Sequence, residues 1–384
     1  MSVHTVQLGD FVSIVGGGTP SRDRPEFFNG LIPWVTVKDL GSEIFLRSAQ
    51  EHISQAGLDG SASRLISAGN VLLATRMAVG RAVINKVEVA INQDLKALSC
   101  GPGLHPGYLL FFLNHKAPEL EAKATGATVK GITIDEIESL EIPLRAVSEQ
   151  KRIARLLEET DRLRRSRRYA LELSDSFLAA VFLELFGDLN SNAKGWTSNV
   201  FDEVCAIDAP LVDPKKLEYR NLPHIGGDNI ESVTGRIVRF RTAAEDGLIS
   251  SKFLIGPDHI LFSKIRPKLR KVSEPRMVAL CSADIYPIRP RSNALILSYL
   301  VGFLRSDYFS RIVSSLAESR TNIPKINREE LSDIPVLLPP IAEQEKFAAS
   351  AKLHERMLAR QREALCQADH LFQSLLHRAF SENG

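Results

Sequence analysis

The feature that most constrains this chain is a repeat within it. The segment from Val147 to Phe186 aligns without a gap with the segment from Ile341 to Phe380. Farther upstream, residues 31–40 correspond to residues 221–230 at a spacing of 190. Solenoid repeats are only about 20–50 residues long, so this spacing indicates the duplication of a whole domain-sized unit.

Each half of the repeat begins with a segment of mixed secondary structure. Residues 1–147 and 195–341 contain β-branched runs such as Arg81–Ile91 and apolar runs such as Tyr108–Leu120, with Gly and Pro between them. The first kind of run favours strands and the second favours helices. An α+β globular domain is therefore predicted for each segment, and 384 residues are enough for two such cores.

Each half then ends in a long helix. From Ser148 to Phe186 there is neither Pro nor Gly, Ser148 is a simple N-cap, and Gly187 is a helix stop. We therefore predict helices within 148–187 and 342–384. About 39 residues at 1.5 Å each make a rod of roughly 58 Å, which is too long to lie unsupported on a small domain.

Apolar residues recur along both predicted helices at steps of three and four. This spacing predicts that the two helices pack on each other as an antiparallel coiled coil, with the globular domains at opposite ends. The residues expected in the seam or against partners are Ile153, Leu156, Leu163, Phe177, Val181, Met357, Leu365 and Phe372.

Five arginines lie within the seven residues from Arg162 to Arg168, although the chain has a net charge of only +2. A solvated helix face is one interpretation, because charge runs usually lie on the surface. A segment that faces phosphate or a partner is the other, since arginine matches phosphate geometry. Some of these arginines could also pair with Glu158, Glu159 and Asp161.

The sequence offers little for catalysis. The Gly-rich run Gly16–Pro20 lacks the lysine of a phosphate-binding loop. The run Asp94–Lys96 ends like a metal-dependent nuclease site, but its repeat partner Asp284–Tyr286 has lost the lysine. Neither a methyltransferase tetrapeptide nor a dinucleotide fingerprint occurs. We therefore expect no catalytic residue, no metal site and no cofactor.

Membrane insertion and a disulfide framework are also disfavoured. No apolar run reaches about 18 residues, and the first residues do not resemble a signal peptide. The four cysteines lie far apart, which fits a reducing compartment. A cytoplasmic protein with no membrane partner is expected.

Basic and polar loops are the candidates for contact with double-stranded DNA, because cations bind phosphates and Arg, Lys and Asn read base edges. Thr19, Ser21 and Arg22 form a polar loop, whose alternative is an ordinary turn between strands. Trp34 is expected in the core rather than stacked on a base. The other candidates are Arg76, Arg81, Lys130, Lys264, Arg266, Lys268, Arg270, Lys271, Arg320, Asn322 and Lys325.

Several motifs, taken in order, resemble the specificity subunit of type I restriction-modification enzymes. They are GGGTPSRDRPEFFNGLIPWVTVKDL, VLLATRMAVGRAVI, NQDLKAL, GATVKGITIDEIESLEIPL, SEQKRIARLLEETDRLRRSRRYALE and, in the second half, ILFSKIRPKLRKV. Each motif is loose by itself, and their joint order covers nearly the whole chain.

The resemblance implies that 1–147 and 195–341 are two target recognition domains, each reading one part of a bipartite DNA site. It further implies that the long helices set the spacing and dock two modification (methyltransferase) subunits, which restriction subunits join. S-adenosylmethionine, ATP and Mg²⁺ would then act in the partner subunits, in a bacterial or archaeal cytoplasm. Because SRTNIPKI (319–326) replaces GATVKGIT, the two domains are expected to read different half-sites.

Two other functions remain open from the sequence. A two-headed scaffold could use the same architecture to bind proteins without any DNA role. A single-chain nuclease would need the run at Asp94 to be catalytic. Steep salt dependence of DNA binding separates the first alternative from a specificity subunit.

Overall fold

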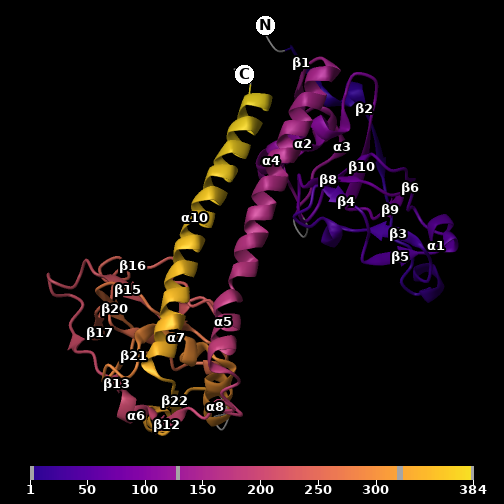
Figure 1. Cartoon of the computed structure of the whole chain (residues 1–384). Coiled ribbons are helices and arrows are strands. Elements are labelled where there is room, and N and C mark those ends of the chain that lie inside the picture. The colour runs from indigo at the N-terminus through magenta and orange to yellow at the C-terminus, as the bar shows by residue number, and fades with distance from the viewer. Residues whose placement is uncertain (1–3, 127–129, 318–322, 382–384) are drawn as a thin grey trace. The chain divides into compact units, whose positions relative to one another are not determined.

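The computed structural model describes residues 4–126, 130–317 and 323–381. The chain forms two compact units, Met1–Arg167 with Ala364–Gly384, and Arg168–Glu363 (Figure 1). We call these the first and second units. The boundaries between the units fall at residues 167/168 and 363/364, within the two long helices.

The first unit is a mixed α+β structure with three small sheets. The five-stranded sheet has the order β2 (Val12–Gly16), β10 (Leu95–Cys100), β7 (Val71–Ala74), β8 (Ala82–Asn85) and β4 (Phe45–Leu46). The four-stranded sheet has the order β5 (Glu51–Ile53), β3 (Ile32–Val35), β9 (Val89–Ile91) and β6 (Leu65–Ile66). The third pairs β1 (His4–Gln7) with β11 (Glu141–Leu144), and the helices are α1 (Gln55–Asp59), α2 (Pro106–Lys123) and α3 (Ile134–Glu138).

The second unit repeats this plan. One sheet has the order β14 (Leu211–Val212), β17 (Lys252–Ile255), β20 (Ala279–Cys281), β15 (Pro223–Ile225) and β16 (Arg241–Thr242). Another has the order β13 (Cys205–Ile207), β21 (Ile285–Pro290), β18 (Ile260–Ser263) and β19 (Val272–Ser273), and a third pairs β12 (Thr197–Val200) with β22 (Pro335–Leu338). Its short helices are α6 (Phe201–Val204), α7 (Leu297–Arg305), α8 (Asp307–Ala317) and α9 (Arg328–Ser332).

Equivalent hydrogen bonds recur in the two units. The amide of Gln150 accepts from the N–H of His105 and donates to two backbone carbonyls at 2.8 Å each. Gln344 makes the same three bonds around Ile296. The hydroxyl of Tyr108 donates to the carbonyl of Pro143, as that of Tyr299 donates to the carbonyl of Leu337. These bonds match residues 194 apart in the long helices and 191 apart in α2 and α7.

The first long helix is interrupted, so the single helix expected from Ser148 to Phe186 is wrong. Helix α4 spans Val147–Ser174 and helix α5 spans Phe177–Phe186, whereas α10 (Ile341–Phe380) is continuous. At the break, Ser174 and Ser176 donate their hydroxyls to backbone carbonyls three or four residues earlier, which competes with helical bonding. In α10, Ala368 stands where α4 has Ser174.

The long helices pack antiparallel within each unit. In the first unit, the guanidinium of Arg164 lies 3.8 Å from the ring of Phe372, and Arg145 donates to the carbonyl of Ala379. In the second unit, the rings of Phe177 and His354 stack at 5.1 Å, and those of Phe182 and Phe347 meet at 5.3 Å. As the residue number rises in one helix, it falls in its neighbour.

The buried face of α4 differs from the predicted stripe. Leu156 and Leu163 are exposed, and Ala154, Leu157 and Thr160 are buried instead. The stripe assumed a seam between two helices, but α4 also packs on α2, where a Cβ at Gly107 would lie 3.1 Å from Ala154. Of the other predicted seam residues, Phe177 and Met357 are exposed, Ile153, Val181 and Leu365 are half-buried, and Phe372 is buried.

The end of α10 completes the core of the first unit. The ring of Phe380 lies 4.9 Å from that of Tyr108, and Phe372 and Leu376 join the same apolar cluster. In the second unit, Phe186 at the end of α5 lies 4.8 Å from Tyr299. Trp34 is 2% exposed, as expected of a core residue.

Candidate nucleic-acid interface

Three loops of the first unit bring five polar residues together. We call Thr19, Arg76, Gln93, Asp94 and Lys96 the first cluster. The hydroxyl of Thr19 donates to the amide oxygen of Gln93, and Lys96 donates to the Gln93 carbonyl at 3.3 Å. The guanidinium of Arg76 lies 3.8 Å from the carboxylate of Asp94.

The charges of the first cluster leave Arg76 available to a ligand. The Arg76 side chain is 54% exposed, whereas that of Asp94 is only 16% exposed. Burial lowers the pKa of Lys96, the nearby charge of Arg76 lowers it further, and Asp94 opposes both effects. The mostly buried carboxylate of Asp94 therefore holds the exposed guanidinium of Arg76 in place at the surface. The backbone of Arg76 also bridges to Gly131, which places the exposed Lys130 next to the cluster.

The corresponding loops of the second unit form a similar group. We call Lys264, Arg266, Asp284, Tyr286 and Lys325 the second cluster. The N–H of Lys264 donates to the carbonyl of Asp284 at 3.0 Å, and the backbone of Ile265 bridges to Lys325. The ammonium of Lys264 lies 5.4 Å from the ring of Tyr286, within reach of a cation–π interaction.

A residue with positive φ lies in the second cluster and another lies next to the first cluster. Arg266 has a φ of +48°, and Met77, which follows Arg76, has a φ of +65°. A non-glycine residue in this region costs about 1–3 kcal/mol and persists where the surrounding structure requires it, often at functional sites. Arg266 is exposed, and Met77 is 71% exposed. The strained conformations therefore present side chains outward rather than fill the core.

Of the predicted polar loop, Thr19 belongs to the first cluster, whereas Ser21 and Arg22 make other contacts. Arg22 pairs with Glu51 at 2.7 Å, and its guanidinium lies 4.2 Å from the ring of Phe28. Ser21 beside it is exposed. Both residues are at the surface, but no bond joins them to Arg76 among the described residues.

The side chain of Arg81 is hydrogen-bonded to the backbone of the first unit. Its guanidinium donates to the carbonyls of Gly41 and Glu43 at 2.6 and 3.0 Å. Burial lowers its pKa, with Asp161 acting in the opposite direction. The side chain is thus held by the backbone of its own unit.

Among the remaining basic candidates of the second unit, some are exposed and others are bound within the protein. Lys268 is exposed, whereas Arg270 pairs with Asp307 at 2.5 Å. Lys271 donates to the carbonyl of Gly227 at 2.7 Å and so ties two loops together. Arg320 and Asn322 lie outside the described residues.

Two arginines of the run on α4 form ion pairs within the protein. Arg164 and Arg165 each bind the carboxylate of Asp161 at 2.7 Å, and that carboxylate is 1% exposed. Arg165 also pairs with Glu43. These two arginines therefore fit neither a plain solvated face nor a phosphate-facing segment, and the expected pairing with Asp161 is confirmed.

A histidine network near the second cluster was not expected from the sequence. Nδ1 of His224 lies 2.7 Å from the carboxylate of Asp246, and Nε2 lies 2.9 Å from the hydroxyl of Ser282. His224 is buried in the middle of β15 and joins two loops. The 3-10 turn Gly227–Asn229 follows this strand, and Lys271 binds its first carbonyl. Ser282 lies 58 residues from His224, so only tertiary structure brings them together.

Lys96 and Tyr286 were also missed as site residues, although the sequence held a signal for them. They are equivalent at the spacing of 190 and take the second position of β10 and β21. A difference between repeats at an equivalent position is what two different half-sites would require.

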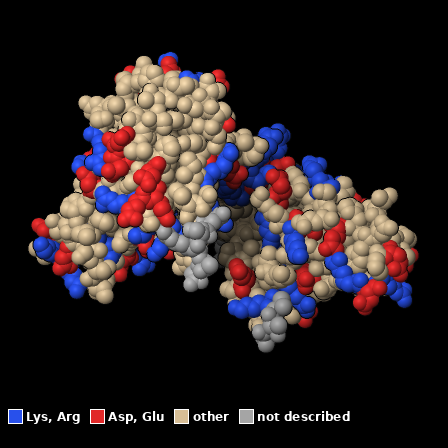
Figure 2. All heavy atoms as spheres, turned by 90° about the horizontal axis from the view of Figure 1, so that it is seen from below, with Lys and Arg blue, Asp and Glu red and all other residues tan. Residues whose placement is uncertain are grey.

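Charges of both signs cover the surface. Figure 2 shows Lys and Arg interspersed with Asp and Glu over the face drawn, rather than one broad basic area. Residues 4–126, 130–317 and 323–381 contain no group of three His, Cys, Asp or Glu side chains placed to hold a metal ion. Within the same ranges, no helix is both long and apolar enough to cross a membrane.

Known proteins resemble this chain in sequence. Residues 2–172 match the type I restriction modification DNA specificity domain. The type I restriction enzyme EcoDI specificity subunit of Escherichia coli is 36% identical over 200 residues, which are 50% of this chain and 43% of the relative. The EcoR124I/EcoR124II specificity subunit of Escherichia coli is 31% identical over 166 residues, 41% of each chain. The chain therefore matches about two fifths of the length of these relatives.

Solved structures share the fold. The S subunit of a type I restriction-modification system from M. genitalium superposes with a TM-score of 0.61 at 14% identity, over 98% of this chain and 96% of that one. A second structure comes from work on complex assembly and conformational transition of the type I R-M system. It superposes with a TM-score of 0.59 at 19% identity, over 98% of this chain and 97% of that one.

Residues 2–172 are thus similar to the type I restriction modification DNA specificity domain, and the two solved structures share the fold of the chain. The relatives that it matches are named specificity subunits.

Proposed function

We propose that this chain is the DNA-recognition subunit of a type I restriction-modification complex and reads a bipartite site. The first cluster would contact one half-site and the second cluster the other. The observation that carries this proposal is the recurrence of the same loops with different side chains, Lys96 in one unit and Tyr286 in the other. Lysine pairs with the O6 and N7 acceptors of guanine, whereas an aromatic ring offers an apolar contact, so different bases would be selected.

Within each cluster, the exposed cations suit DNA. Arg76, Lys130, Arg266, Lys268 and Lys325 are exposed around the anchoring aspartates. Contacts to phosphates position a protein on DNA, whereas contacts to base edges give specificity. Residues of both kinds are needed, and the strained loops of Arg76 and Arg266 are our candidates for base reading.

In this proposal, the long helices separate the two half-sites and dock two modification subunits, with restriction subunits joining them. Large apolar side chains remain exposed on these helices, among them Tyr169 at 61%, Leu183 at 58% and Leu353 at 60%. Exposed apolar patches mark protein interfaces, so these side chains are our candidates for contact with the modification subunits. A two-headed scaffold would also expose such surface, but it would not need paired cationic loops.

The chemistry then belongs to the partners. S-adenosylmethionine, ATP and Mg²⁺ would be bound by the modification and restriction subunits, in a bacterial or archaeal cytoplasm. This chain would supply recognition, and Asp94 would orient Arg76 rather than hold a metal ion.

DNA binding of the chain with its co-purified modification subunits tests the proposal. Affinity for the methylated motif should fall steeply as salt rises from 50 to 200 mM, because each phosphate contact contributes a slope of about −0.9 in log K against log salt. A complex with no modification subunit and no salt-dependent DNA binding would favour the scaffold instead.

A further inference from the structure

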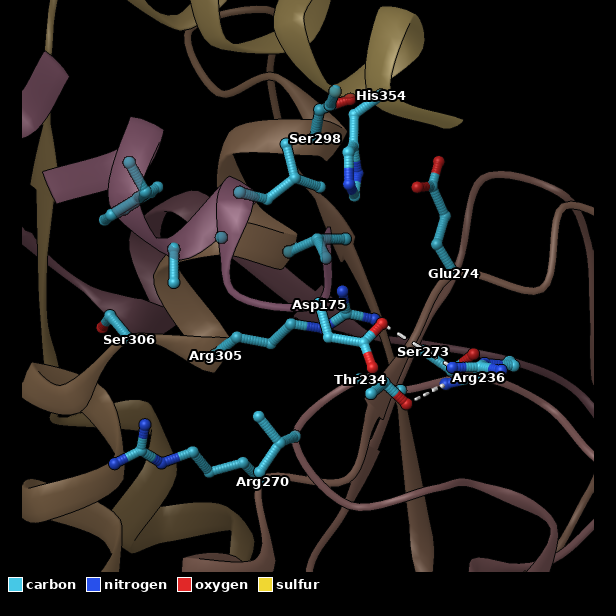
Figure 3. A pocket seen from close by; sticks show the side chains of 18 of the residues that line it. Asp175, Thr234, Arg236, Arg270, Ser273, Glu274, Ser298, Arg305, Ser306 and His354 are labelled. Atoms are coloured by element: carbon cyan, nitrogen blue, oxygen red, sulfur yellow. Dashed lines mark hydrogen bonds and ion pairs between the residues drawn. The ribbon is translucent and has the colours of Figure 1, made fainter. Parts of the chain in front are cut away.

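The second unit contains a pocket of about 950 Å³ beside the break between α4 and α5 (Figure 3). Its walls come from α5, α7 and α10 and from the loops 233–240 and 273–277. Pockets that hold small molecules typically measure about 300–1,000 Å³ and are mostly apolar with a few polar groups. The apolar lining includes Leu178, Phe182, Val301 and Leu358.

The pocket exists because the second unit has smaller side chains where the first unit is filled. In the first unit, the rings of Phe111 and Phe372 meet at 6.1 Å, and the guanidinium of Arg164 covers Phe372 at 3.8 Å. The equivalent residues of the second unit are Gly302, Leu178 and Leu358, all of which line the pocket. A Cβ at Gly302 would lie only 2.5 Å from the ring of Phe182, so α5 and α7 pack closely beneath the pocket.

A half-buried arginine takes part in the lining. Nε and Nη2 of Arg305 donate to the carbonyl of Val272 at 3.1 and 2.7 Å. Burial lowers the pKa of Arg305 to about 10, and the carboxylate of Glu274 opposes this effect. The described residues provide no carboxylate within 4.0 Å of its guanidinium. Arginine has five N–H donors, so part of its planar fork remains free for a ligand.

The acids around the pocket already have partners. Asp175 lies 3.7 Å from Arg236, Asp307 lies 2.5 Å from Arg270, and Arg276 binds both Glu274 and Glu355. Figure 3 shows Arg305 lying across the pocket while the guanidinium of Arg270 points away from it. The positive charge of Arg305 is therefore not neutralised by these acids.

We propose that this pocket binds a small amphipathic monoanion, with its oxyanion on Arg305 and its apolar body against Leu178, Phe182 and Leu358. A guanidinium fork matches the two oxygens of a carboxylate or sulfonate. A dianion fits less well, because its second charge would be desolvated without a partner. The first unit has Asn114 at the place of Arg305, and Asn114 bonds to the backbone of Ala82 in a comparable way.

The probe for this site is 1-anilinonaphthalene-8-sulfonate, titrated into the full-length chain and followed by its fluorescence. Arg305→Met should weaken binding by about 10- to 100-fold, since a charge-assisted hydrogen bond is lost. Binding of the neutral analogue N-phenyl-1-naphthylamine should not weaken. Arg291→Met is the matched control, because Arg291 also donates to a backbone carbonyl, that of Cys205, outside the pocket.

A second variant keeps the test valid if Arg305→Met does not fold, as judged by its melting temperature. Leu178→Phe installs the residue of the first unit, Phe372, and should block the pocket and abolish binding while the melting temperature is kept. Decanoate should displace the probe, and 1-naphthyl phosphate should do so at least tenfold less well. The proposal would be overturned if the probe bound folded Arg305→Met and Leu178→Phe as tightly as the wild-type chain. It would also be overturned if the neutral analogue displaced the probe as well as decanoate does.

Discussion

Asp94 lies 3.8 Å from the guanidinium of Arg76, and Asp284 takes the same place in the second unit, where its carbonyl binds the N–H of Lys264. An acidic residue at the centre of a cationic loop repels phosphate, so its presence weakens DNA binding unless it orients a cation. The aspartate is therefore a positioning residue in our account.

Asp94→Asn tests this positioning role. Removing the negative charge should raise non-specific DNA affinity slightly and lower discrimination for the cognate site by about 0.2–1 kcal/mol, the usual range for a partly exposed ion pair. The ratio of Kd values for cognate and scrambled duplexes measures the effect. Asp59→Asn, an exposed acid that pairs with Gln55, is the control. An unchanged ratio would leave Asp94 without this role.

Gln150 should be important for stability. Its buried amide makes three part-buried bonds to the backbone, so Gln150→Leu removes the partner of one N–H and of two carbonyls. We expect the free energy of unfolding to fall by roughly 1–3 kcal/mol. Urea unfolding measures it, with the exposed Gln373→Leu on α10 as the control. Equal midpoints for the two variants would contradict the prediction.

The cysteines should differ sharply in reactivity. Burial raises the pKa of Cys100, Cys205 and Cys281 to about 12, so at pH 8 only about one thiol in ten thousand is ionised in each. Cys366 is exposed on α10. Reaction with a disulfide reagent at pH 8 should therefore release one fast equivalent per folded chain. That fast phase should disappear in Cys366→Ser, and its persistence would show that a buried thiol is accessible.

Much of this architecture could be predicted because the chain repeats itself. The spacing of 194 pairs Gln150 with Gln344 and Phe186 with Phe380, and each pair makes equivalent contacts. The α+β class followed from short strands between turns. The break after Ser174 was not predicted, because no Pro or Gly marks it and its cause is hydroxyl groups that bond to the backbone.

Contacts set by tertiary structure were the harder part. The helical stripe was assigned to the wrong face because α4 packs on α2 as well as on α10. Arg81 looked like a DNA ligand in sequence, yet the carbonyls of Gly41 and Glu43 hold it. Nothing local in the sequence joins His224 to Ser282.

Lengthening the helices tests their proposed spacer role. Four helix-forming residues would be inserted after Arg167 in α4 and after Glu363 in α10, where the helices pass from one unit to the other. Each helix then grows by about 6 Å, close to two base pairs. Methylation mapping should reveal the same half-sites with a gap one or two base pairs longer, with some loss of activity. An active double insertion that keeps its original gap would rule out the spacer role.

The central claim is that the two clusters read two different half-sites. Its most direct test is to map methylated bases across the genome of cells that carry the complete system with the wild-type chain, Arg76→Ala or Arg266→Ala. Each substitution should cost about 1–3 kcal/mol at the base that it reads. The account predicts that Arg76→Ala relaxes one half of a bipartite motif and Arg266→Ala relaxes the other. Loss of discrimination in the same half by both variants, or a motif that does not depend on this chain, would contradict it.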